Sequence, residues 1–198
     1  QGQVDNGWNN GAENNNGKYY GIQLGVTPIK PLPIVINYAE SSEPTQISTG
    51  DALSLLDVIV TYNATDALSF MLNYDNATQK NALASGDASW DGIAVYGRYA
   101  ITPMIAVALR LEQFNDADGY RTDPSNMYGT LGNGGQKLTE ETLTLEHNSL
   151  AGCLVRLEYR HDSTNLATSN PGGTGFTKED GTPSQTQDTL TLGVVHTF

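Results

Sequence analysis

The chain has 198 residues, of which 38% are hydrophobic and 16% charged, and its 22 acidic residues against 10 basic ones give a formal net charge of −12. An acidic chain is repelled by phosphate backbones, so the composition argues against a nucleic-acid-binding protein. The single cysteine, Cys153, excludes a disulfide framework and a cysteine-rich metal site.

Apolar and polar residues alternate with a period of two along most of the chain, which is typical of β-strands whose two faces meet different surroundings. Residues 1–17 are polar and are predicted to form a loop. Most of the alternating segments are close to the roughly 9–11 residues with which a tilted strand crosses a bilayer. The pattern predicts an all-β protein, one domain over residues 1–198, with nine strands at 18–27, 32–40, 51–62, 68–75, 89–101, 105–116, 137–147, 150–162 and 188–198.

Short and long connections alternate strictly between these strands. The short connections are 28–31, 63–67, 102–104 and 148–149, and the long ones are 41–50, 76–88, 117–136 and 163–187. This alternation favours an up-and-down antiparallel meander whose two ends face different compartments, as in outer-membrane barrels with short periplasmic turns and long extracellular loops. Pro33 stands just inside an expected strand, which predicts a strand start or a bulge there.

Charged residues inside the strands share the face opposite the apolar one. A charge that faces lipid at the midplane costs about 2–4 kcal/mol, so this separation favours a transmembrane barrel over a soluble sandwich. The charged face is expected to line a wet pore, and the alternative is a salt-bridge ladder across a narrow, closed barrel. The predicted pore-lining residues are Asp57, Asp75, Arg98, Arg110, Glu112, Glu146, Arg156, Glu158 and Arg160.

Aromatic residues fall at the ends of the apolar faces rather than in their middle. Two such bands, one strand length apart, are typical of the aromatic girdles at the two membrane interfaces. The predicted girdle consists of Tyr38, Tyr62, Tyr74, Tyr99, Tyr159 and Phe198.

Several runs resemble the OmpL-like porin family of Gram-negative β-barrels, matching the C-terminal half of its members. These runs are Leu56–Asp66, Leu109–Gly119 and Leu154–Asp162, and the last strand, which ends in Phe198, is similar to the closing strand of outer-membrane proteins. The resemblance implies an outer-membrane location, contact with lipid, passage of small hydrophilic solutes or ions, and recognition by the barrel-assembly machinery. Because a ninth strand would run parallel to the first, further N-terminal strands of a larger, even-numbered barrel are expected.

No catalytic or metal-binding group is predicted, and neither is a cofactor. His147, His161 and His196 lie on different strands, and the neighbours His161 and Asp162 point to opposite faces of the sheet. An alternative to the porin is a non-conducting barrel that serves as an adhesin or as a scaffold for a surface or periplasmic partner. The connections 117–136 and 163–187 can either narrow the pore or be displayed outward. The sequence leaves the oligomeric state undecided, with a homo-oligomer as one alternative.

The long connections and the N-terminal stretch carry more acids than bases. Eight acids against three bases give a net charge of −5, which concentrates cations near the entrance. A mild cation preference is therefore predicted from the acids Asp5, Glu13, Glu43, Asp87, Asp118, Asp123, Glu179 and Asp180 and the bases Lys80, Arg121 and Lys178.

Overall fold

The computed structural model describes residues 1–5, 16–43, 51–83, 85–122, 135–150, 152–169 and 175–196. Ten strands form one sheet, and a separate hairpin of β10 (Phe176–Thr177) and β11 (Pro183–Ser184) lies between β9 and β12 in the sequence. No helix among these residues is long and apolar enough to cross a membrane. The ten strands are β1 (Gly2–Asp5), β2 (Tyr19–Val26), β3 (Ile34–Glu43), β4 (Asp51–Asn63), β5 (Leu68–Leu83), β6 (Gly86–Ala100), β7 (Ile105–Asp116), β8 (Gln136–Leu150), β9 (Cys153–Thr164) and β12 (Thr186–His196).

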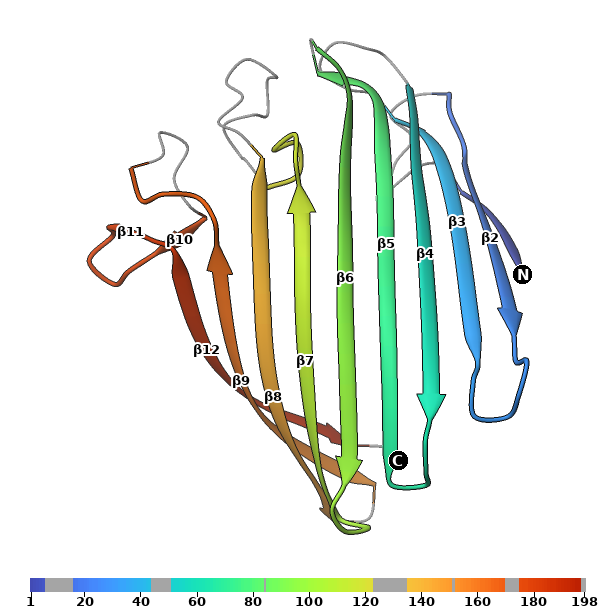
Figure 1. Cartoon of the computed structure of the whole chain (residues 1–198), viewed down its shortest axis with the longest axis vertical. Coiled ribbons are helices and arrows are strands. Elements are labelled where there is room, and N and C mark those ends of the chain that lie inside the picture. Colours follow the sequence, from blue (N-terminus) through green and yellow to red (C-terminus); the bar gives the residue numbers. More distant parts are fainter. Residues whose placement is uncertain are drawn as a thin grey trace.

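The sheet is an antiparallel meander in which every strand pairs with its neighbours in the chain, and β12 pairs with β9. Figure 1 shows the strands side by side in a curved sheet, with the tight turns at its lower end. The predicted all-β, up-and-down architecture is confirmed. Among the described strands β1 and β12 are the two edges, so these ten strands form an open, curved wall.

The expected count of nine strands was wrong, because residues 2–5 form β1 rather than a loop. This strand has only one large apolar residue, Val4, and is defined by its pairing with β2, which alternation cannot reveal. With ten antiparallel strands, β1 and β12 run in opposite directions. The inference of missing strands from an odd strand number therefore fails, and a larger barrel stays a prediction.

The connection expected at 76–88 is also mostly strand. β5 continues to Leu83 and β6 begins at Gly86, with a register shift between Gln79 and Leu83. Gly86 has a φ of 133°, a conformation that side chains with a Cβ rarely adopt. Only one face of this extension is buried. Because the residues on its other face are polar, the segment resembles a polar loop in the sequence.

Hydroxyl side chains close two of the tight turns. Thr65 Oγ1 accepts hydrogen bonds from the backbone N–H groups of Ala67 and Leu68, and Thr102 Oγ1 accepts them from Met104 and Ile105. Pro33 immediately precedes β3, so the prediction of a strand start is confirmed. Such turns need no long loop, and they explain why one end of the sheet is compact.

The two faces of the sheet differ in both chemistry and burial. Apolar side chains on one face are exposed, for example Leu109 at 47% and Leu157 at 45%, whereas Glu140 and Glu146 on the opposite face are buried. Side chains on the concave face of a curved sheet crowd together, so this difference identifies the polar face as the inner one. We call it the inner face, and the apolar face the outer face.

The apolar band of the outer face ends at one polar residue on each of the strands β3 to β9 and β12. In the register of the sheet these polar residues follow the last apolar or aromatic side chain on the side of the long connections. The band is therefore continuous across the sheet, as contact with lipid requires. Its polar boundary consists of Glu40, Ser54, Asn76, Asp91, Gln113, Glu141, His161 and Asp188.

Candidate functional site: the charged inner face

Glu146 of β8 joins two arginines near the tight-turn end of the inner face. Its Oε2 lies 2.8 Å from Nη2 of Arg98 on β6, and its Oε1 lies 2.9 Å from Nη2 of Arg156 on β9. The Glu146 side chain is only 9% exposed, whereas those of Arg98 and Arg156 are 49% and 50% exposed. One enclosed carboxylate thus anchors two guanidinium groups that remain in contact with solvent.

A second network surrounds Glu140, nearer the long connections. Its Oε1 accepts a hydrogen bond from Arg110 Nη1 at 2.7 Å, and its Oε2 lies 3.0 Å from Arg160 Nη2. Arg110 also pairs with Glu112, and Arg160 donates to both oxygens of Asp162 at 2.7–3.0 Å. Again the central acid is enclosed, with 6% exposure, and the Arg160 side chain is 44% exposed.

The wall from β2 to β5 carries amides and acids instead of arginines. Gln23 donates to Asn37 at 2.9 Å, and the Asn37 and Asn73 side-chain amides both donate to the Asp57 carboxylate. Asp75 lies directly across from Asp57 in the pairing of β4 with β5. The middle of the inner face is therefore polar from β2 to β9, and among the described strands its arginines lie on β6, β7 and β9.

A small apolar cluster occupies the inner face near the long connections. Leu53, Ala77 and Trp90 are buried there, and Phe114 and Tyr120 pack against them. Tyr120 belongs to the connection between β7 and β8, and its ring stacks on Trp90 with 5.9 Å between the centroids. The beginning of that connection therefore folds over the inner face.

The other long connection also contributes to the inner face. Phe176 of β10 lines a pocket together with Glu112, Glu140 and Arg160, and Phe114 lies in the same wall. Both connections thus place at least one aromatic side chain against the charged wall.

All nine predicted pore-lining residues lie on the inner face, where the register brings most of them into contact. Glu140 and Asp162 were missed, although they have the same strand parity as Glu146 and Glu158. Trp90 and Arg121 were missed as a pair, because only the fold brings them together. Whether the inner face conducts stays a prediction.

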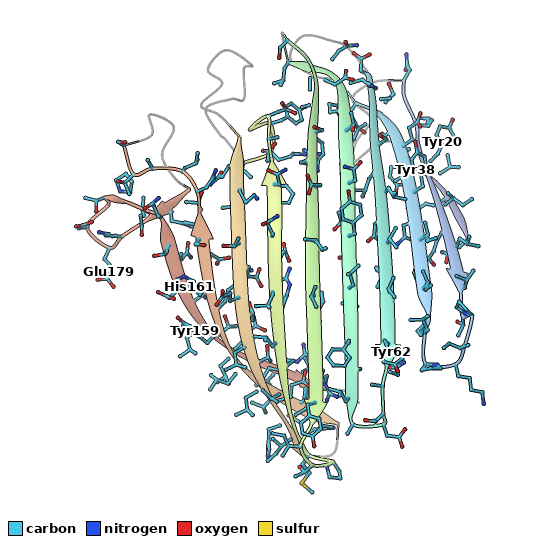
Figure 2. All side chains as sticks on the ribbon, viewed as in Figure 1. Tyr20, Tyr38, Tyr62, Tyr159, His161 and Glu179 are labelled. Atoms are coloured by element: carbon cyan, nitrogen blue, oxygen red, sulfur yellow. The ribbon has the colours of Figure 1, made fainter. Side chains whose placement is uncertain are left out.

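The predicted girdle residues that the structure describes lie on the outer face. Tyr62 and Tyr99 end the apolar band at the tight turns, and Tyr38, Tyr74 and Tyr159 directly precede its polar boundary. Figure 2 shows Tyr62 and Tyr38 toward opposite ends of the sheet. Phe198 lies outside the described residues. The position of these rings at the two membrane interfaces stays a prediction.

Two of the three histidines make contacts that do not resemble those of metal ligands. His161 Nδ1 lies 2.8 Å from Asp188 Oδ1, which also accepts a hydrogen bond from the Tyr159 hydroxyl, and His196 contacts the carbonyl oxygen of Gly152. Within the described ranges, no three His, Cys, Asp or Glu side chains come close enough together to hold a metal ion.

Several of the charged residues expected at the entrance have partners. Lys80 pairs with Asp87 at 2.6 Å, and Asp118 accepts a hydrogen bond from the Ser89 backbone at 2.8 Å. The hydroxyl and backbone N–H of Thr182 donate to Asp180 and lower the pKa of that carboxyl. Glu13 and Asp123 lie outside the described residues, and the cation preference stays a prediction.

Comparison with solved structures finds the same architecture in a porin. The chain is similar to the NanC porin in its rhombohedral crystal form, with a TM-score of 0.58 and 13% sequence identity over 92% of this chain and 79% of that one. At this identity the likeness concerns the fold alone. No curated protein sequence matches the chain.

The family comparison matches the complete chain. Residues 1–198 fit the model of the beta-barrel porin-2, OmpL-like family, as the resemblance predicted. Proteins of this family and fold are porins rather than enzymes, and they reside in the bacterial outer membrane. The chain, with its lipid-compatible outer face and charged inner face, belongs to the OmpL-like β-barrel porin family.

Proposed function

We propose that the inner face lines a water-filled pore through which small hydrophilic solutes and ions diffuse passively across the outer membrane. The family supports a porin, and the solute class is our inference from the chemistry of the wall. Paired guanidinium and carboxylate groups, amides and hydroxyls offer weak, exchangeable contacts along the whole face. Such contacts suit passage rather than tight binding.

The observation that carries this proposal is the unequal exposure of the two partners in the ion pairs that Glu140 and Glu146 form with arginines. Glu140 and Glu146 are 6% and 9% exposed, whereas Arg98, Arg156 and Arg160 are 44–50% exposed. A ladder that filled a narrow barrel would enclose both partners. Here the acids lie beneath the arginines, which leaves a hydrated, cationic surface over this part of the wall.

Conductance of the full protein in planar bilayers tests the proposal directly. We expect ohmic channels in potassium chloride, and Glu146→Gln should raise the relative permeability of chloride because it removes the carboxylate that neutralises Arg98 and Arg156. The matched control is Glu141→Gln, which removes an acid from the outer face of the same strand. An equal effect of the two substitutions would contradict the assignment of Glu146 to the pore wall.

The competing function is a non-conducting barrel that acts as an adhesin or a scaffold. It predicts no channels at any voltage or salt concentration from a protein that is folded in the bilayer. Heat-modifiable migration in gels, measured on the same sample, establishes that the protein is folded. Recognition by the barrel-assembly machinery and a homo-oligomeric state stay predictions.

A further inference from the structure

Asp116, the last residue of β7, fixes the first turn of the connection to β8. Its side chain is fully buried, and its Oδ2 accepts hydrogen bonds from the backbone N–H of Arg121 at 2.6 Å and of Thr122 at 2.8 Å. Oδ1 accepts a third from Tyr120 N–H at 3.1 Å. Three consecutive amides are therefore directed at one carboxylate, which determines where the side chains of this turn lie.

The turn places Arg121 over the aromatic pair on the inner face. Its guanidinium carbon lies 4.3 Å from the centroid of the Trp90 ring and 5.7 Å from that of Tyr120. Trp90 has the same strand parity as Arg98, so the platform belongs to the inner face. Trp90 is buried and Arg121 is exposed, which leaves the cation on the solvent side of the platform.

Arg121 differs from the strand arginines in its charge partners. Each of Arg98, Arg110, Arg156 and Arg160 has a carboxylate within 3.0 Å. Among the described residues, no carboxylate forms an ion pair with the Arg121 guanidinium, which lies over aromatic rings, while the Arg121 backbone N–H donates to Asp116. A guanidinium stacked by its face retains in-plane N–H donors, which match the two oxygens of an oxyanion.

We propose that Arg121, held over Trp90 and Tyr120, is an anion-contact site at the entrance of the pore. It takes a carboxylate, sulfate or phosphate group of a passing solute, and Asp116 is its positioning residue. The inference rests on the proposed function for the route of the solute, but binding at the site does not require conduction.

Reversal potentials across a potassium chloride gradient test the role in conduction. Arg121→Gln should lower the chloride-to-potassium permeability ratio up to about tenfold, because one unit charge at about 6 Å in water changes the local concentration of each ion about threefold and in opposite senses. Arg121→Lys should retain the wild-type ratio, and the control Lys178→Gln, which removes a base from the other long connection, should change it less. If Arg121→Gln leaves the chloride-to-potassium permeability ratio unchanged, Arg121 has no such role in conduction. Repeating the measurement in bilayers of a phosphate-free lipid, such as a monoacylglycerol, excludes lipid phosphates as the source of any effect.

Tryptophan fluorescence tests binding without conduction. The chain has two tryptophans, so Trp8→Phe leaves Trp90 as the reporter beneath Arg121. Sodium sulfate at constant ionic strength should change the Trp90 emission saturably, and Arg121→Gln in this background should abolish the change. A flat titration, or one that Arg121→Gln leaves intact, overturns the site. If channels are absent but this titration holds, the proposed function fails and the site stands.

Discussion

Asp116 illustrates how one side chain can organise a connection. It is fully buried, and it satisfies the backbone N–H groups of Tyr120, Arg121 and Thr122. Asp116→Ala leaves these donors without an acceptor, which we expect to destabilise the turn by about 1–3 kcal/mol. Hydrogen exchange of the 116–122 peptide should become faster, whereas exchange of the β8–β9 ladder should not. Equal exchange in the two proteins would show that the turn does not depend on this carboxylate.

Asp180 gives the β10–β11 hairpin a dependence on pH. Hydrogen bonds from Thr182 lower the pKa of the folded carboxyl below its ordinary value. The stabilisation is therefore complete above the unfolded pKa of about 3.9 and is lost as the pH falls through the lower, folded value. We expect the amide signal of Thr182 to move below about pH 4, and Thr182→Val, which removes the hydroxyl donor, to shift the transition toward higher pH. A transition at the same pH in both proteins would contradict this role.

The inner-face residues differ in how well the sequence predicts them. Strand parity places Arg98, Glu146 and Arg156 on one face, and the same parity would have identified Glu140. Parity cannot pair Arg121 with Trp90, because that contact depends on how a connection folds back over the sheet. The Asn115–Gly119 run shows only a polar turn in the sequence, and the enclosure of Asp116 follows from the fold.

At the scale of the elements, the alternation of β12 leads to a direct test of which face meets lipid. Leu192 and Thr191 are adjacent but point to opposite faces, and Thr191 lies across from Glu158. Leu192→Arg should lower the free energy of unfolding by about 2–4 kcal/mol because it places a charge at the lipid midplane. Thr191→Arg should cost far less, since its charge faces water and Glu158. Urea unfolding in lipid vesicles measures both, and equal losses would refute the assignment of the faces.

Strand boundaries followed from the sequence only where the membrane imposes its pattern. Within the apolar band the expected and observed strands agree closely, as in the segment 105–116. Beyond the band no lipid requires apolar residues on the outer face, so the ends of β5 and β6 are rich in polar residues and were assigned to a loop. β1 escaped prediction for a related reason, because four residues are too few to establish a period.

At the scale of the whole molecule, two electrostatic effects of different range act at the entrance. The net charge of −5 on the connections is unchanged by the Lys80–Asp87 pair, because that pair removes one charge of each sign. Its field extends about 30 Å at 0.01 M salt but only about 3 Å at 1 M. Cation preference in reversal potentials should therefore fall as salt rises, whereas the contact of Arg121 with anions should persist. A preference for anions at 0.01 M, or one for cations that is constant with salt, would refute the long-range effect.

The β5–β6 hairpin continues well beyond the apolar band, which ends at Asn76 and Asp91 on these strands. From Asn76 to Leu83, at about 3.4 Å per residue, β5 rises roughly 24 Å along its own direction. On the cell surface this part of the β5–β6 hairpin would project beyond the membrane on one side of the opening. A macromolecule too large to enter the opening would meet this hairpin before the rest of the wall.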